Sequence, residues 1–271
     1  MISHRFSAAN KAYWNERVDT NLRDWDLDSF LGDPARLTDI VTADREAVGE
    51  VRGKSLVHLQ CHFGLDTLAW SRLGAQATGV DFSPRAIAVA VDLARRIGAS
   101  TRFFEADLYE TPRVIPEVFD IVYTSGGVLC WLPDLVAWAN VISRLLKPGG
   151  VFYIREAHPA LWSLEDERDD DQLVVGLPYF ETTEPWRWDG DPVWEKAGLH
   201  RTTQYNWSHG LGEIVNALIG AGLTIEFLKE HKTCLWQALP FMVQDDDGWW
   251  RLPDRPERLP LMYSISALKS L

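Results

Sequence analysis

Residues 55–86 constrain the fold of this chain more than any other segment. A short apolar strand runs into a turn that ends at Gly64, and leucines at helical spacing follow the turn. A second apolar strand, over residues 77–80, has Asp81 at its carboxyl end. A strand–turn–helix–strand unit with an acid at this point is typical of sheets that bind the ribose of an adenosine-containing cofactor.

The turn of this unit discriminates between two kinds of cofactor. It reads Gln60-Cys61-His62-Phe63-Gly64, with a single glycine. A pyrophosphate is cradled by backbone N–H groups where several glycines let it approach, as in a G-x-G-x-x-G sequence. The turn is therefore a poor dinucleotide site and is more compatible with the smaller homocysteine portion of S-adenosylmethionine. Cys61 is interpreted as a small residue in a glycine-like position, and a nucleophilic role is the alternative.

The composition is that of a globular protein. The 271 residues are 46% apolar, which suits one large domain or one domain with a substantial insertion. No apolar run approaches the roughly 20 residues of a membrane span, and the first residues contain no apolar signal core. The three cysteines are widely spaced, which predicts reduced thiols rather than disulfides or a zinc site. We therefore expect a cytoplasmic protein without a membrane partner.

The net charge of −12 argues against a nucleic-acid partner, because binding phosphates requires clustered lysines and arginines. It fits a neutral or cationic substrate better than an anionic one. The acidic run over residues 165–171 has no neighbouring histidine or cysteine, so it is interpreted as a surface loop and no metal is predicted. The chain has 13 tryptophans, and some of them are expected to form flat pocket walls that bind cations.

Strands and helices alternate through the first part of the chain. Helices are predicted over residues 10–21 and 34–50, and Ser83 followed by Pro84 marks the start of another helix. The other predicted elements of this part are strands over residues 101–105, 118–123 and 151–156 and a helix over residues 135–146. This alternation implies a parallel sheet that is covered by helices on both faces.

Residues 157–206 break this rhythm, because they hold prolines, tryptophans and acids without helical spacing. They are predicted to form an insertion with β-hairpin content over the carboxyl edge of the sheet. Regular structure resumes with a helix over residues 209–220 and strands over residues 223–230 and 261–268. The predicted organisation is an N-terminal helical cap (1–50), a cofactor-binding core (51–156), a lid or substrate insertion (157–206) and the C-terminal part of the core sheet (207–271).

Five segments in a fixed order carry a resemblance to a known family. They are VHLQCHFG at 57–64, Asp81 at the end of the second strand, ADL at 106–108, FDIVYTSGGVLCWLPD at 119–134 and LLKPGG at 145–150. In this order and spacing the chain resembles the class I S-adenosylmethionine-dependent methyltransferases, in particular the small-molecule type 11/25 group. The resemblance implies an α/β, Rossmann-like sheet of seven mostly parallel strands, the last of them antiparallel, with helices on both faces.

The resemblance also implies roles for cofactor-binding residues. Asp107 would meet the exocyclic amine of adenine, with the backbone of Leu108 beside it, and a helix cap is the alternative for Asp107. Tyr13 and Trp14 are expected to close over the cofactor or, alternatively, to pack on the sheet. The expected cofactor-binding residues are Tyr13, Trp14, Gln60, Cys61, His62, Gly64, Asp81, Phe82, Ser83, Ala106, Asp107, Leu108 and Ser125.

The chain departs from the family in its first motif. His58 stands where the family has an acid, and Gln60 and His62 replace glycines. The side chains of Gln60 and His62 are therefore expected to touch the cofactor or the substrate pocket. A glutamine amide can bind either the carboxylate or the amine of the cofactor.

Two histidines are candidates for a general base. His158 follows the fifth strand, and His209 stands at the start of a late helix. An imidazole with an ordinary pKa near 6.5 can accept a proton, while a structural hydrogen-bonding role is the alternative for each. The expected substrate-contacting residues are Trp131, Glu156, Trp162 and Tyr205.

These observations predict an S-adenosylmethionine-dependent methyltransferase that releases S-adenosylhomocysteine and acts on a small molecule. The acidic, tryptophan-rich character favours N- or O-methylation of an amine or a sugar-like compound. Two alternatives remain open: a cofactor-binding module without turnover, favoured by the altered first motif, and a nicotinamide-dependent oxidoreductase. The expected partner is a small-molecule acceptor, and the expected assembly is a monomer or a homodimer.

Overall fold

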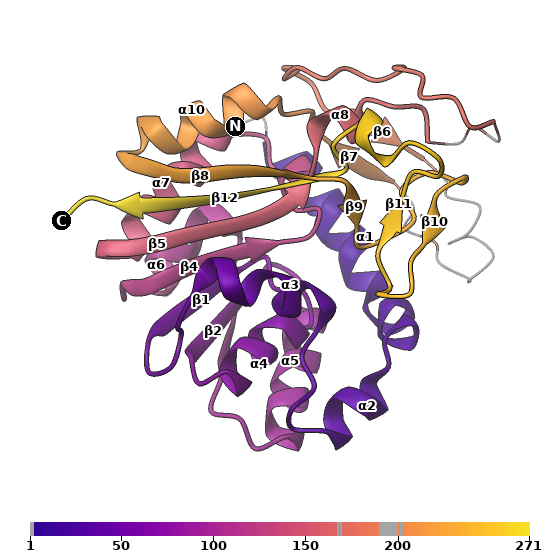
Figure 1. Ribbon diagram of the computed structural model, residues 1–271. Helices are drawn as coiled ribbons and strands as arrows, with labels where there is room; N and C mark the ends of the chain where they lie inside the picture. The colour runs from indigo at the N-terminus through magenta and orange to yellow at the C-terminus, as the bar shows by residue number, and fades with distance from the viewer. Residues whose placement is uncertain (1–2, 167, 169, 190–199, 201–202) are drawn as a thin grey trace.

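A computed structural model describes residues 3–166, 168, 170–189, 200 and 203–271, and centres on a seven-stranded sheet (Figure 1). The strand order is β3-β2-β1-β4-β5-β12-β8. The strands are β1 (Ser55–Leu59), β2 (Gln76–Asp81), β3 (Arg102–Glu105), β4 (Phe119–Ser125), β5 (Leu146–Ala157), β8 (Leu223–His231) and β12 (Met262–Lys269). β12 runs in the opposite direction to the other six strands of this sheet. The predicted Rossmann-like sheet with an antiparallel last strand is confirmed.

Helices cover both faces of this sheet (Figure 1). Those described are α1 (Ser3–Asp24), α2 (Leu27–Gly32), α3 (Asp39–Val48), α4 (Leu65–Arg72), α5 (Pro84–Arg96), α6 (Thr111–Val114), α7 (Leu135–Leu145), α8 (Pro159–Trp162) and α10 (Leu211–Gly220), with short 3-10 helices at Leu108–Glu110, Leu129–Trp131 and Pro256–Arg258. Residues of α7 and α10 share one buried apolar cluster with the sheet, and residues of α3, α4 and α5 share another. This layering buries apolar side chains on both sheet faces, as a mostly parallel sheet requires.

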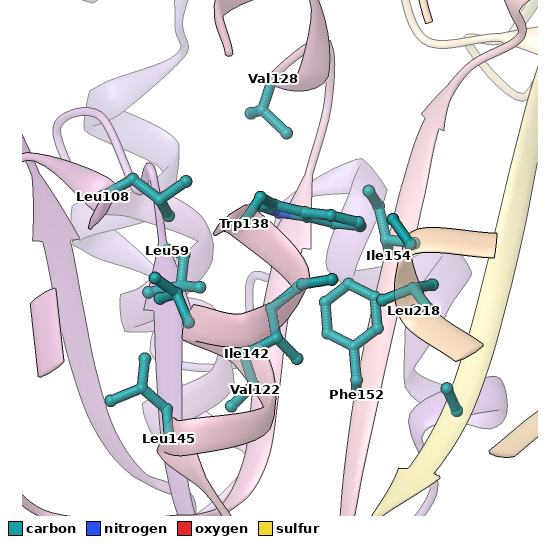
Figure 2. Packing of buried hydrophobic residues seen from close by; sticks show 14 of the residues in the cluster. Leu59, Leu108, Val122, Val128, Trp138, Ile142, Leu145, Phe152, Ile154 and Leu218 are labelled. Atoms are coloured by element: carbon teal, nitrogen blue, oxygen red, sulfur yellow. The ribbon is translucent and has the colours of Figure 1, made fainter. Parts of the chain in front are cut away.

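The cluster beneath α7 is built around an indole. Figure 2 shows Trp138 among Ile142, Phe152 and Ile154. Its ring meets that of Phe152 edge-on, with the ring centroids 5.6 Å apart. Trp138 is fully buried, so α7 is fixed to the sheet by one of the largest side chains of the core.

Helix starts follow from local capping. Ser83 caps α5, since its hydroxyl accepts a hydrogen bond from the N–H of Ala86 at 3.1 Å, and Pro84 opens the helix as predicted. Thr38 caps α3 in the same way. The helix predicted from residue 34 therefore begins at Asp39, because Thr38 provides the first hydrogen-bonding cap. The short helix α2 was not predicted.

Residues 157–206 contain α8 and an antiparallel strand pair, β6 (Trp186–Trp188) with β7 (Gln204–Asn206). This antiparallel pair lies in the segment for which β-hairpin content is predicted. Residues 167, 169, 190–199 and 201–202, which include part of the predicted acidic loop, lie outside the described residues.

The segment that connects β8 to β12 in the sequence forms a second, three-stranded sheet, which was not predicted. It consists of β9 (Thr233–Cys234), β10 (Val243–Gln244) and β11 (Trp250–Arg251). It packs on α8 through a third apolar cluster that includes Leu161, Cys234 and Leu252. Strands of two residues are too short to form an alternating pattern of apolar and polar residues, so periodicity does not predict them. Among the described residues, no helix is long and apolar enough to cross a membrane.

Candidate active site

A cavity of about 820 Å³ opens at the carboxyl ends of β1, β2 and β4. It is lined by Gln60 after β1, Asp81 at the end of β2, Ala106 after β3 and Ser125 at the end of β4. The chain runs from β1 through β2 to β3 on one side and then crosses to β4 on the other side of β1. The strand order therefore reverses between β1 and β4, and α/β sheets bind ligands at the carboxyl ends of the strands at such a point.

The turn after β1 has an unusual backbone. Gln60, His62 and Gly64 have φ angles of 56°, 50° and 79°, in the left-handed region. This conformation costs non-glycine residues roughly 1–2 kcal/mol each, so the surrounding structure must hold it. The N–H of His62 donates to Asp81 Oδ2 at 2.8 Å, and Gln60 Nε2 donates to the Val128 carbonyl at 3.1 Å. The turn therefore keeps the shape that glycines would give it while adding two side chains to the cavity.

Both of these side chains belong to the lining of the cavity. Oε1 of Gln60 and Nε2 of His62 are buried and have no hydrogen-bond partner within the described ranges. A Cβ atom at Gly64 would lie 2.5 Å from the Phe103 ring, so only this position of the turn requires glycine sterically. Cys61 also lines the cavity, and burial raises the pKa of its thiol, which favours the predicted packing role over a nucleophilic one.

Two backbone hydrogen bonds fix the Asp81 side chain at the carboxyl end of β2. Its two carboxylate oxygens accept hydrogen bonds from the N–H groups of His62 and Ser83, each at 2.8 Å. Burial raises its pKa to about 6, although these backbone bonds work against the shift. A carboxylate oxygen can accept more than one hydrogen bond, so Asp81 can still accept from ligand hydroxyls in the cavity.

Asp107 fulfils the helix-cap alternative and also lines the cavity. Its Oδ1 accepts from the N–H of Tyr109 at 3.0 Å at the start of the 3-10 helix, and its Oδ2 lies 3.4 Å from the hydroxyl of Ser7 on α1. Ala106 is tied to β2 by a bond from its N–H to the Asp81 carbonyl at 3.0 Å. These bonds hold Asp107, which caps the 3-10 helix, at a fixed position in the cavity lining.

Aromatic side chains from α1 and from the segment after β4 close one side of the cavity. Trp14 lines it and lies 5.3 Å from the His62 ring and 5.2 Å from the Trp131 ring, measured between centroids. Trp131 lines it as well and donates from Nε1 to the Gly127 carbonyl at 2.9 Å. Tyr13 is buried behind them, 5.6 Å from Trp131, and supports the cluster without lining the cavity.

The lining of the cavity also contains polar residues that the sequence did not single out as site residues. They are His58 on β1, Asp66 in the first turn of α4, and Asp39 in the first turn of α3. His58 is 2% exposed, and its Nδ1 lies 2.9 Å from the hydroxyl of Thr67. Burial lowers the pKa of His58 to about 3 and raises that of Asp66 to about 6. The departure of His58 from the family motif was the available sequence signal.

The buried His58 makes stability depend on pH. Because folding lowers its pKa from 6.5 to about 3, protonation favours the unfolded state, and stability falls as the pH drops below 6.5. Between pH 7 and pH 5 this group should cost about 2 kcal/mol. We expect wild-type protein to lose about that much more unfolding free energy over this interval than His58→Gln, measured by urea denaturation at both pH values.

Asp66 and Asp81 act in the opposite direction, since a raised carboxyl pKa destabilises the fold as pH rises towards 6. The comparison with the variant removes their contribution, because both proteins share it. Equal pH dependence of the two proteins would contradict the assignment of a neutral, buried His58.

The two histidines predicted as bases lie outside the cavity lining. His158 Nδ1 accepts from the N–H of Ala160 and caps α8, and its Nε2 lies 3.1 Å from Glu230. His209 Nε2 lies 2.8 Å from the Leu132 carbonyl, and its Nδ1 lies 3.0 Å from Glu213. Both ring nitrogens of each histidine contact protein atoms, which favours the structural alternative over the role of base.

Three of the four predicted substrate residues also lie elsewhere. The Glu156 carboxylate accepts from the N–H groups of Val128, Leu129 and Ala157, and so it holds the loop after β4. Trp162 is 41% exposed, and the backbone of Tyr205 is bonded to the side chain of Asn10. Of the predicted cofactor residues, Tyr13, Gly64 and Ser83 do not line the cavity, and the last two begin α4 and α5.

Comparisons with known proteins agree with this geometry. The methyltransferase domain family matches residues 57–154. An uncharacterized methyltransferase of Synechocystis sp. is 25% identical over 170 residues, which are 61% of this chain and 76% of that protein. A ubiquinone biosynthesis O-methyltransferase of Xanthomonas euvesicatoria is 29% identical over 132 residues, 48% of this chain and 52% of that protein.

The fold matches solved structures as well. A putative S-adenosylmethionine-dependent methyltransferase from Listeria monocytogenes superposes with a TM-score of 0.63 at 16% identity, over 86% of this chain and 99% of that one. The chain thus shares its architecture with this protein over almost the whole length of the latter.

Proposed function

The chain belongs to the class I S-adenosylmethionine-dependent methyltransferases, and we propose that it methylates a small-molecule acceptor with S-adenosylmethionine. The observation that carries this proposal is the cavity at the carboxyl edge of the sheet, where Asp81 and Asp107 lie beside the altered turn. The family match argues against the nicotinamide-dependent alternative. In addition, the turn after β1 lacks the glycines that a pyrophosphate site needs.

The residues of the cavity fit the cofactor in each of its parts. Asp81 would accept hydrogen bonds from the ribose hydroxyls, and Asp107 from the adenine amine. The unpartnered atoms of Gln60 and His62 would receive the polar end of the methionyl group. Buried polar atoms without partners are rare in folded proteins, so a ligand that pairs with them supports the assignment. When bound, S-adenosylmethionine supplies a methyl group on a sulfonium.

The protein's own contribution is alignment and the exclusion of water. Trp14 and Trp131 cover the turn with flat apolar rings, and Trp207 lines the same cavity. When the acceptor is held in line with the methyl group, the two reactants no longer have to meet by diffusion in the correct orientation. This positioning can lower the activation free energy of methyl transfer by roughly 7–11 kcal/mol. Neither His158 nor His209 is assigned to proton transfer, since neither lines the cavity.

The acceptor class follows from the charge of the lining. Carboxylates line the cavity, whereas no lysine or arginine does so in the described part of the chain. We therefore favour an acceptor with an amine or hydroxyl over an anionic one. The predicted monomer or homodimer and the predicted cytoplasmic location stay predictions.

The test is calorimetric titration of the purified protein with S-adenosylmethionine and S-adenosylhomocysteine, followed by a screen for S-adenosylhomocysteine release with paired amines and alcohols. We expect micromolar binding of both compounds and turnover with at least one acceptor. Binding without release in the whole screen would favour the module without turnover, for which the altered turn is the supporting observation. The absence of binding would overturn the proposal.

A further inference from the structure

We propose that the part of the cavity lined by His58, Asp66 and Asp39 is a subsite for the ammonium group of a cationic acceptor. This inference rests on the proposed methyltransferase function and adds the residues that select the acceptor. The subsite is separate from the residues assigned above to adenosine and to the turn.

Two atoms of this subsite lack a partner. Nε2 of His58 and Oδ1 of Asp66 are both buried, and neither makes a hydrogen bond with the residues that the structure describes. His58 is 2% exposed, so water reaches it poorly. Leaving a buried polar group unpaired costs roughly 1–3 kcal/mol, which a ligand with hydrogen-bond donors or acceptors would offset.

Rigid elements hold these side chains in place. Nδ1 of His58 lies 2.9 Å from the hydroxyl of Thr67 on α4, and the His58 ring packs edge-on against Tyr123 at a centroid distance of 5.0 Å. Asp66 belongs to the first turn of α4, and Asp39 to the first turn of α3. The subsite is therefore preorganised by a strand and two helices rather than by a loop.

The walls of the subsite come from parts of the chain that are far apart in sequence. A Cβ atom at Gly126 would lie 3.8 Å from Ile40 of α3, and one at Gly127 would lie 3.9 Å from the Trp236 ring. The loop after β4 thus approaches both α3 and the segment after β9. Trp236 lines the cavity there, and Trp25 adds a second indole to the lining.

The charge of the subsite favours a cation. Asp39 and Asp66 contribute carboxylates, while burial lowers the pKa of His58 to about 3, so this imidazole adds no positive charge. Arg155 is not among the lining residues, and its guanidinium is paired with Asp44. An ammonium would pair with these carboxylates and lie against indole faces, which attract cations by about 0.5–2 kcal/mol. The expected acceptor is a small molecule that carries an ammonium group on an apolar body.

An ammonium could come from the acceptor or from the methionyl end of the cofactor, and Asp66→Asn separates the two sources. S-Adenosylhomocysteine carries the amino-acid end, whereas 5′-methylthioadenosine lacks it. Both would be titrated into wild-type protein and Asp66→Asn. Arylalkyl amines, each paired with the alcohol of the same skeleton, would then be titrated into protein saturated with S-adenosylhomocysteine. Asp92→Asn, at a partly exposed position on α5, is the matched control for the loss of one charge.

We expect Asp66→Asn to bind both nucleosides within threefold of wild type and to bind the best amine at least tenfold more weakly, with the alcohols unchanged, because a charge-assisted hydrogen bond is lost. Weaker binding of S-adenosylhomocysteine but not of 5′-methylthioadenosine would overturn the proposal by assigning Asp66 to the cofactor. So would a wild-type protein that binds no amine more tightly than its alcohol.

The two proposals fail in different ways. A wild-type protein that does not bind S-adenosylhomocysteine contradicts the methyltransferase function itself, whereas normal cofactor binding without amine selectivity contradicts only the subsite. If Asp66→Asn does not fold, the same titrations with His58→Gln test the subsite, since this variant lacks the second unpartnered atom, Nε2 of His58. Weaker binding of the amines with unchanged binding of both nucleosides is then expected.

Discussion

Replacement of Asp81 by alanine is expected to weaken the binding of S-adenosylmethionine at least about a hundredfold. A hydrogen bond to a charged group contributes roughly 1.5–3 kcal/mol, and two such bonds to the ribose hydroxyls together exceed the 2.7 kcal/mol that correspond to a hundredfold change. The carboxylate also accepts from the N–H groups of His62 and Ser83. Its loss therefore loosens the turn that carries the methionyl end of the site.

Calorimetric titration of wild type, Asp81→Ala and Asp81→Asn would measure this effect. Asparagine keeps the shape of the side chain and one acceptor oxygen, so the Asp81→Asn variant should bind the cofactor more tightly than the Asp81→Ala variant.

Asp107→Ala should show a smaller loss of cofactor affinity, about tenfold, since one hydrogen bond to adenine is removed. Asp92→Asn, at a partly exposed position on α5, serves as the control. If Asp81→Ala bound the cofactor within threefold of wild type, the assigned site would be contradicted.

Replacement of Asp44 by alanine is expected to lower the unfolding free energy by about 3–5 kcal/mol. Asp44 is fully buried on α3 and accepts from the hydroxyls of Tyr153 and Tyr123 at 2.7 and 2.8 Å and from Nε of Arg155 at 2.5 Å. Burial raises the pKa of Asp44, although Arg155 works against this shift. Without the carboxylate, Arg155 would be left as a buried cation without its counter-ion.

Urea denaturation at pH 7 would measure this loss. Tyr153→Phe removes one neutral donor to the same carboxylate and should cost only about 1–2 kcal/mol. Asp19→Ala is a control, because Asp19 is exposed on α1 and pairs with Arg85 at the surface; a loss below about 1 kcal/mol is expected there. If Asp44→Ala cost no more than Asp19→Ala, the buried network would not stabilise the fold.

The Asp44 network also connects the fold to the site. Asp44 joins α3 to β4 and β5, and the first turn of the same helix carries Asp39 and Ile40 into the cavity. A helix fixed by three hydrogen bonds holds these two residues at a constant distance from the sheet. The stability of the network and the shape of the acceptor end of the cavity therefore depend on the same contacts.

The sequence by itself determined the elements whose signals are local. The alternation of apolar strands and amphipathic helices, the cap at Ser83 and the acid at the end of β2 predicted the sheet and the cofactor edge. Capping and periodicity involve residues within one turn or one strand, so they can be read from neighbours in the chain. Cys61, Asp107 and Trp131, named from the sequence, all line the cavity.

Only the tertiary structure decided which side chains line the cavity together. His58, Asp66 and Trp236 come from three separate segments, and the short strand β9 that leads to Trp236 has no periodic signal. His158 and His209 looked like bases in the sequence, but the fold turns their nitrogens towards protein atoms. Contacts between residues distant in sequence depend on how helices pack across the sheet, and this packing is set by the whole core rather than by any local pattern.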